Sequence, residues 1–275
     1  MKDFLIVANT SKDESLLVAG QVKDYLIMHG AKATIVEDVD HIPEYCIHDC
    51  AIVLGGDGTM LRASKYLVTQ GVPMVGLNLG TVGFMAEIEP NDFEYAMDSL
   101  LKDEYRVEDR MNLMGTIYHN GRVLMEEYAL NDIVISRAGY SRVICLRITV
   151  NGELLDVYEA DGVVISTPTG STAYNLSAGG PIVSPKANLI LITPVAPHSL
   201  TSKPVVLSDT DEIEIEIVRK RKSQQAEALA TFDGGDYIEL QPSDHIKIKR
   251  ADYRTKLVRL SKQSFYEILR SKLSV

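Results

Sequence analysis

Short apolar runs alternate with helical patterns over the first hundred residues of the chain. The runs at residues 4–9, 33–36, 51–54 and 73–78 predict strands, and the first is apolar enough for a strand buried on both faces. Apolar residues recur at helical spacing over 16–26, closed by Gly30, then over 59–70 and 92–102. Strands separated by helices predict βαβ units and a parallel sheet.

The pattern changes after about residue 110. Asn120-Gly121 separates the apolar-rich runs 113–118 and 123–128, and Asn151-Gly152 separates 142–150 and 153–158, so each pair predicts a hairpin. Residues 212–217 alternate strictly between Glu and Ile, which predicts a half-buried strand whose glutamates face water. Residues 245–249 alternate too, and the last twenty residues return to helical spacing.

Two closely packed domains follow from these patterns. We predict an α/β N-terminal domain with a parallel sheet, formed by residues 1–100 and 255–275, and a β-rich, antiparallel, sandwich-like C-terminal domain, formed by 101–254. The length of 275 residues is ample for two domains with cores of their own.

Composition and charge exclude several classes of protein. With 45% apolar and 24% charged residues the chain is an ordinary globular protein, not a collagen-like, low-complexity or disordered one. The net charge of −10 argues against nucleic acid or an anionic membrane as partner. No apolar stretch approaches the ~18 residues of a membrane span, and the N-terminus lacks a secretory h-region, so we expect a cytoplasmic protein.

The three cysteines are expected to be reduced thiols. Their odd number suits a reducing compartment. Cys46 and Cys50 lie near His41 and His48, but their spacing matches no common zinc pattern, and Cys145 is isolated. The basic run 219–222 is expected to be a solvated turn.

The stretch Gly55-Gly56-Asp57-Gly58-Thr59 lies between a buried strand and a helix. Glycines allow close approach to a phosphate, and the helix N-terminus offers free N–H groups. Asp57 could accept a hydroxyl proton in phosphoryl transfer or hold Mg²⁺. The alternative is a tight turn without chemistry.

Two further stretches suit a nucleotide. Residues 78–84 form an irregular, glycine-containing segment in which Phe84 could cover a flat ring or belong to the core. Residues 166–181 combine hydroxyls, glycines and Tyr174, and no charged residue occurs from 162 to 185. Such a set suits a nucleoside, although composition alone also allows a polar loop.

These motifs together resemble the bacterial-type NAD kinases, the GGDGT-containing ATP-NAD kinase family. GGDGT at 55–59, NLGTVGF at 78–84, Asn131-Asp132 and DGVVISTPTGSTAYNLSAGGP at 161–181 occur in that family's order and spacing. GGDGT alone is shared with lipid kinases of the diacylglycerol type, which we retain as an alternative together with a dinucleotide-binding sensor that has lost catalysis. The long third motif is what singles out NAD kinases.

The resemblance implies phosphoryl transfer from ATP, with Mg²⁺ or another divalent cation, to the 2′-hydroxyl of the adenosine ribose of NAD. It makes Asp57 the base or the group that orients that hydroxyl, places Gly58 in the phosphate loop and puts Phe84 in the adenine pocket. Asp132 stands where the family usually has Glu, so the acid is one methylene shorter. The late Asp233-Gly234 matches the family only weakly and is assigned no role. Positions that match the family's remaining NAD contacts are Asn131, Asp161, Thr169, Thr172, Ala173, Tyr174, Ser177 and Ala196.

The resemblance also implies partners. NAD and ATP are the expected substrates, and family members form homodimers or homotetramers with sites at domain and subunit contacts. No residue is assigned as a dedicated metal ligand. Whether polyphosphate can replace ATP is left open by the sequence.

Overall fold

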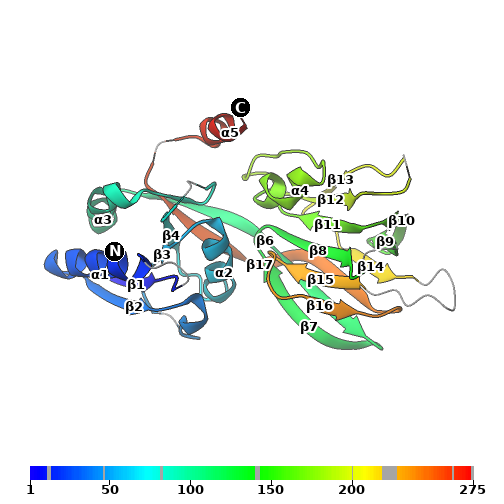
Figure 1. Cartoon of the computed structure of the whole chain (residues 1–275), viewed down its shortest axis with the longest axis horizontal. Helices are drawn as coiled ribbons and strands as arrows, with labels where there is room; N and C mark the ends of the chain where they lie inside the picture. Colours follow the sequence, from blue (N-terminus) through cyan, green and yellow to red (C-terminus); the bar gives the residue numbers. More distant parts are fainter. Residues whose placement is uncertain are drawn as a thin grey trace. The chain divides into compact units, whose positions relative to one another are not determined.

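The computed structural model of the chain describes residues 1–10, 14–45, 47–80, 83–139, 143–199, 201–218, 228–261 and 263–273. They form two compact units, Met1–Arg110 with Tyr253–Val275 and Met111–Asp252 (Figure 1). Two long strands, β6 (Arg106–His119) and β17 (His245–Arg259), contribute residues to both units.

The first unit contains a parallel sheet. Its order is β4-β3-β1-β2, and β17 and the short β5 also pair with β4 in parallel. Its strands are β1 (Asp3–Val7), β2 (Lys32–Val36), β3 (Cys50–Leu54), β4 (Met74–Leu77) and β5 (Ala86–Ile88). The four strands expected from apolar runs are thus present, and β5 is an addition that the sequence pattern did not predict.

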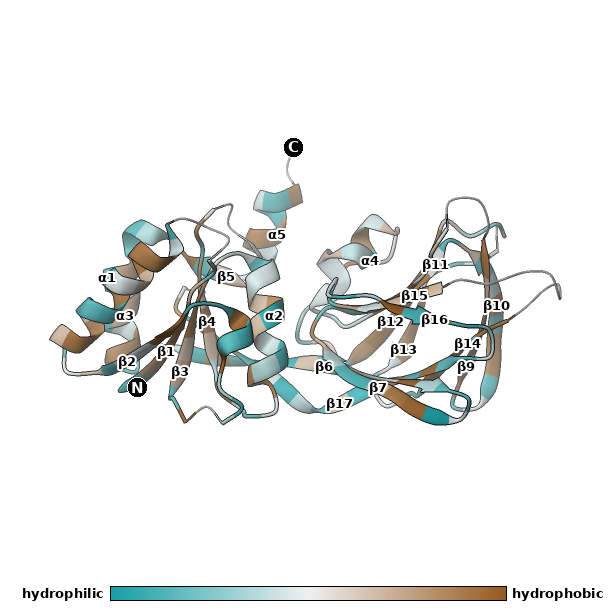
Figure 2. Cartoon of the chain, turned by 60° about the horizontal axis from the view of Figure 1, so that its bottom comes forward, coloured by the Kyte–Doolittle hydropathy of each residue, from teal (hydrophilic) through white to brown (hydrophobic). Residues whose placement is uncertain are grey.

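Helices cover both faces of this sheet. Figure 2 shows α1 (Ser15–Met28) and α3 (Phe93–Leu101) beside one face of the apolar strands and α2 (Asp57–Leu67) beside the other. The core on the α1 side joins Val22 and Leu26 to Phe4, Ile6 and Ile52 of the sheet. The C-terminal helix α5 (Phe265–Leu273) confirms the helical spacing seen at the end of the sequence. Short 3₁₀ turns occur at η1 (Val39–His41) and η2 (Pro90–Asp92).

The strands of the second unit are antiparallel and belong to a six-stranded sheet and to the antiparallel part of an eleven-stranded mixed sheet, which also includes the parallel strands. The six-stranded sheet has the order β13-β12-β11-β8-β15-β16. Its strands are β8 (Asp132–Arg137), β11 (Gly162–Ser166), β12 (Leu189–Val195), β13 (Val205–Ser208), β15 (Ala228–Phe232) and β16 (Ile238–Leu240). The strands packed against it are β7 (Arg122–Ala129), β9 (Ile144–Val150), β10 (Glu153–Ala160), β14 (Ile213–Ile217) and parts of β6 and β17. One apolar core includes residues of both layers, so the predicted sandwich is confirmed.

Both predicted hairpins are present. Asn120 and Gly121 have φ of 49° and 75°, and Asn151 and Gly152 have φ of 53° and 82°, so both central residues of each turn are left-handed as a type I′ turn requires. In β14 the isoleucines are buried and Glu214 and Glu216 are partly exposed, which confirms the half-buried strand.

Cys50 and Cys145 are buried, whereas Cys46 and the basic run 219–222 lie outside the described residues. In the part of the chain that the structure describes, no helix has the length and apolar character that a membrane span requires.

Candidate active site

The carboxyl ends of β1 and β3 lie side by side in the first sheet. The chain leaves β1 toward β2 and leaves β3 toward β4, so this is the point where the strand order reverses and where open α/β sheets bind ligands. Asn9 follows β1, and its Nδ2 donates to Thr59 Oγ1 over 3.0 Å. A side chain at Gly55 would overlap that same hydroxyl, at 2.3 Å. Asn9 was not among the predicted site residues; its signal is a polar amide directly after a buried strand.

Asp57 is the first residue of α2, and its carboxylate lies against the segment that precedes β5. Oδ2 accepts the backbone N–H of Phe84 at 2.7 Å, and Oδ1 accepts those of Met85 and Ala86 at 3.0 and 3.2 Å. A Cβ on Gly83 would lie 2.0 Å from Oδ1, so only glycine allows this approach. A carboxylate has about four acceptor positions, and N–H groups of the described residues occupy three of those of Asp57.

The surroundings of Asp57 suit a phosphate-bearing ligand. Gly58 is exposed in the first turn of α2, and a Cβ there would meet nothing within 4 Å. The first turn of α2, which carries the positive partial charge of the helix N-terminus, is therefore accessible at Gly58. Phe84 is half-buried, and its ring centroid lies 6.4 Å from that of Phe265 in α5, while Met85 is buried.

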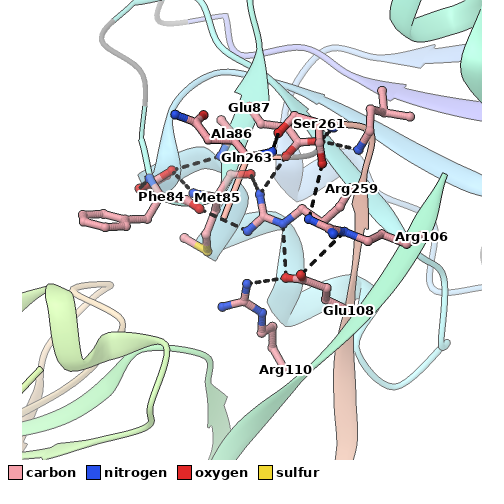
Figure 3. A network of polar contacts seen from close by, with 12 residues as sticks. Phe84, Met85, Ala86, Glu87, Arg106, Glu108, Arg110, Arg259, Ser261 and Gln263 are labelled. Atoms are coloured by element: carbon pink, nitrogen blue, oxygen red, sulfur yellow. Dashed lines mark hydrogen bonds and ion pairs between the residues drawn. The ribbon is translucent and has the colours of Figure 1, made fainter. Parts of the chain in front are cut away.

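Residues 83–86, which we call the Asp57 segment because the Asp57 carboxylate binds their N–H groups, are also contacted by Arg259. Its guanidinium donates to the carbonyl oxygens of Phe84 and Met85 at 3.1 Å each, and it pairs with Glu87 and Glu108 at 3.3 Å (Figure 3). Sequence reasoning missed this residue because no local motif surrounds it.

At one end of the strands of the six-stranded sheet, the turn before β8 lies beside the turns that follow β11 and β15. The registers Asp132↔Ser166 and Ile133↔Phe232 bring the start of β8 to the ends of β11 and β15. Asp233 follows β15 with φ 53°, and its carboxylate accepts the backbone N–H groups of Leu130, Asn131 and Asp132 at 2.7, 2.7 and 3.0 Å. The residue that matched the family only weakly thus anchors the Asn131-Asp132 turn.

Asp132 is a buried acid beside this anchored carboxylate. It is 5% exposed, and burial, followed by repulsion from Asp233, raises its pKa to about 7. The folded protein therefore binds a proton at this position that the unfolded chain, with an ordinary Asp pKa near 3.9, has already lost at pH 5 to 6.

We predict that Asp132→Asn stabilises the protein in a pH-dependent way. The folded-state pKa is raised, so the stability associated with the protonated acid is present below about pH 4 and is lost as the pH rises through about 7. The variant lacks this loss, and its advantage in unfolding free energy should grow from near zero at pH 4 toward roughly 3–4 kcal/mol at pH 8. Urea unfolding at several pH values measures it, with exposed Asp236→Asn as the control. Parallel stability curves for wild type and Asp132→Asn would contradict the prediction.

The third motif continues from the same end of the sheet. A Cβ on Gly170 would lie 2.2 Å from the Asn131 carbonyl oxygen, and Thr167 donates to the backbone oxygens of Leu130 and Asn131. The turn η3 (Gly170–Thr172) and helix α4 (Tyr174–Ser177) follow. Thr169 is buried, Thr172 and Ala173 are half-buried, and Tyr174 and Ser177 are exposed.

Asn175 holds this motif together, although it was not among the predicted site residues. It is fully buried and donates to the carbonyls of Ser171 and Pro181 at 3.1 and 3.0 Å, while Thr193 of β12 donates to its Oδ1 at 2.7 Å. Three hydrogen bonds to one buried amide hold the motif in a single conformation.

Asp161 and Ala196 lie at the opposite end of the same sheet. Gly162 at the start of β11 pairs with Val195 and with Ser136, so its neighbours Asp161 and Ala196 are separated from the Asn131-Asp132 turn by β11, a strand of roughly 13 Å. Arg137 Nε donates to Asp161 Oδ1 at 2.7 Å, and Ala196 has φ 44°. Within this unit the structure therefore groups the predicted residues into two sets, one at each end.

Comparison with known proteins gives a consistent result over the whole chain. Residues 4–105 match the family model of the ATP-NAD kinase N-terminal domain, and residues 130–260 match that of the ATP-NAD kinase C-terminal domain. The NAD kinases of Lachnoclostridium phytofermentans and Agathobacter rectalis are 45% and 43% identical, and each alignment covers 99% of both chains.

Solved structures share the fold. A yeast NADH kinase complexed with NADH superposes with a TM-score of 0.90 at 22% identity, covering 99% of this chain and 87% of that one. An NAD kinase from Archaeoglobus fulgidus in complex with ATP gives 0.77 at 23% identity, covering 98% of each.

Proposed function

The chain belongs to the NAD kinase family, and from this premise we propose which of its residues carry the reaction. The enzyme transfers the γ-phosphoryl group of ATP to the 2′-hydroxyl of the adenosine ribose of NAD, which gives NADP. The observation that supports the assignment most directly is the anchored carboxylate of Asp57 at the N-terminus of α2, at the reversal point of the parallel sheet.

Asp57 orients the ribose hydroxyl and accepts its proton as the bond to phosphorus forms. Three backbone N–H groups hold the carboxylate, so its remaining acceptor position has a defined direction. A positioned base of this kind contributes typically 10²–10⁴-fold. The glycine-rich turn and the N–H groups that begin α2 bind phosphate oxygens, with Gly58 leaving the approach open. The ring of Phe84 covers the adenine.

The dinucleotide is held by the two sets of residues in the second unit. Asn131, Asp132 and the third motif form one set, and Asp161 with Ala196 forms the other. Because the two sets lie at opposite ends of β11, a homodimer or homotetramer that combines one set with the other set of a second copy supports a complete site better than one chain alone. Chromatography with light scattering tests this assembly.

A divalent cation enters with ATP. The described residues contain no group of three or more His, Cys, Asp and Glu side chains that could hold a metal ion, whereas Mg²⁺ in kinase sites needs only one or two carboxylates beside the substrate phosphates. The ATP phosphates and water would supply most of its ligands, which leaves the last acceptor position of Asp57 to the ribose hydroxyl. The bound cation would neutralise charge on the transferred phosphoryl group. We also propose that the enzyme works in the cytoplasm, which the odd number of cysteines in the sequence supports.

The test is NADP formation by the purified protein, read with an NADP-specific dehydrogenase. We expect a signal that requires NAD, ATP and Mg²⁺ together. Replacing ATP by polyphosphate tests the donor. Replacing NAD by diacylglycerol, with ADP release measured instead of NADP, tests the lipid-kinase alternative. A folded protein that binds NAD but forms no NADP with either donor would be a sensor and would overturn the proposal.

A further inference from the structure

Arg259 lies at the end of β17 and is almost completely buried, with 6% of its side chain exposed. Nη2 donates to the Phe84 carbonyl and Nη1 to the Met85 carbonyl, both at 3.1 Å (Figure 3). The planar guanidinium fork can hold two adjacent carbonyls at once, which a lysine ammonium cannot do with the same geometry.

The same short segment binds Asp57 through its N–H groups. The Phe84–Met85 peptide group donates the Met85 N–H to the Asp57 carboxylate and accepts from Arg259 at the Phe84 carbonyl. The Met85–Ala86 peptide group does the same through the Ala86 N–H and the Met85 carbonyl. The peptide groups therefore connect a negative carboxylate to a positive guanidinium, with every dipole oriented favourably. Hydrogen bonds in such a chain polarise and strengthen one another in a site of low dielectric constant. The position of Arg259 thus affects the position of Asp57 without direct contact.

Two carboxylates hold Arg259 in place. Glu108 accepts from Arg259 Nε at 3.3 Å and from Arg110 at 2.7 Å. Burial opposes the ionisation of Glu108, but hydrogen bonds and charge from Arg110 and Arg259 together lower its pKa below the ordinary value. Glu108 therefore remains charged at neutral pH and keeps both guanidinium groups paired.

The second carboxylate connects this network to the C-terminal tail. Glu87 pairs with Arg259 at 3.3 Å and also accepts the backbone N–H groups of Leu260 and Ser261 at 2.5 and 3.2 Å. The chain leads from there to α5, whose Phe265 lies beside the ring of Phe84. The segment before β5 is therefore held on one side by Asp57 and on the other by the tail.

We propose that Arg259 is a positioning residue for phosphoryl transfer, which acts through the Phe84–Met85 peptides on both the Asp57 carboxylate and the Phe84 ring. This inference rests on the proposed function, because it assigns Arg259 to the site where Asp57 meets the ribose hydroxyl. The fork on the carbonyls of Phe84 and Met85 is the feature that connects Arg259 to the Asp57 carboxylate.

The test is a double-mutant cycle on the turnover number for NADP formation. Arg259→Met keeps the packing of the aliphatic part of the side chain but removes the charged guanidinium and its hydrogen bonds to the two carbonyls. We expect kcat to fall about 10–100-fold, since small displacements of a catalytic group lower the rate by factors of this size. In the Asp57→Asn background the same substitution should lower kcat less than about threefold, because its effect passes through Asp57. Arg250 is another arginine of β17, and Arg250→Met, which removes its partly buried ion pair with Asp209, serves as the control with unchanged kcat.

A second variant keeps the proposal testable if Arg259→Met does not fold. Arg259→Lys retains a charge beside Glu87 and Glu108, and we expect an intermediate kcat with the same coupling to Asp57→Asn. Equal fold-losses in the two backgrounds, or unchanged kcat in the folded variants, would overturn the inference and leave the NAD kinase assignment intact. Absence of NADP formation by the wild type would instead overturn the proposed function, and this inference with it.

Discussion

Asp57→Asn lowers kcat for NADP formation by about 10²–10⁴-fold, the usual contribution of a positioned general base. An amide keeps the size of the carboxylate but cannot accept the ribose proton. The amide NH₂ also replaces a carboxylate oxygen that accepted backbone N–H groups at N···O distances of 2.7–3.2 Å, so some of those N–H groups lose their acceptor. We therefore also expect a lower melting temperature, since each N–H left without an acceptor costs on the order of 1–3 kcal/mol.

Kinetics separate the two effects of this substitution. The loss should fall on kcat and kcat/KM alike, because the proton is transferred only on the way to the transition state. Measurements belong at a temperature where circular dichroism shows the variant folded, with Asp24→Asn on the exposed side of α1 as the matched control. Near-full kcat in the folded variant would show that Asp57 is not the base, and a raised KM at constant kcat would make it a binding anchor only.

Asp233→Ala is expected to have the second largest effect, on stability and on NAD binding together. The carboxylate accepts three backbone N–H groups from residues 130–132, which no other side chain replaces once it is removed. We expect the free energy of unfolding to fall by about 3–5 kcal/mol. The Asn131-Asp132 turn should lose its defined conformation, and KM for NAD should rise at least tenfold, equivalent to about 1.4 kcal/mol of binding energy.

The control for this change comes from the segment between β15 and β16, which also contains Asp233. Asp236 is exposed, and Asp236→Ala should leave both quantities near their wild-type values. Relief of repulsion on Asp132 works against the loss of stability, because removal of the Asp233 charge lowers the cost of ionising its neighbour. A variant as stable as wild type with unchanged KM would show that Asp233 does not hold the turn.

Local patterns predicted most of the secondary structure, because hydrophobic periodicity and turn residues act within a few positions. The strands β1 to β4 and the hairpins at Asn120-Gly121 and Asn151-Gly152 are examples. The strand β5 was missed because three residues are too few for a period, and its pairing with β4 depends on the loop that Asp57 holds.

The motifs located much of the candidate site, since each needs a particular backbone and side chain close together in the sequence. GGDGT placed Asp57 at a strand-to-helix turn, and in the structure Gly170 and Thr167 of the third motif lie against the backbone of Leu130 and Asn131. The roles of Asn175 and Asn9 depend on contacts with Thr193 and Thr59, and no spacing rule reveals such contacts.

The α/β and β-rich character of the two parts, the family and the residues that carry a motif could be predicted from the order and local spacing of residues. What holds these residues in place becomes visible only in the folded chain. Asp233 anchors a turn about a hundred residues earlier, and Arg259 supports a segment about 175 residues before it. Hydrogen bonds between such distant positions arise only when strand pairing brings them together, and they need only one suitable donor or acceptor at each end. Such single residues have no pattern by which a sequence alone would reveal them.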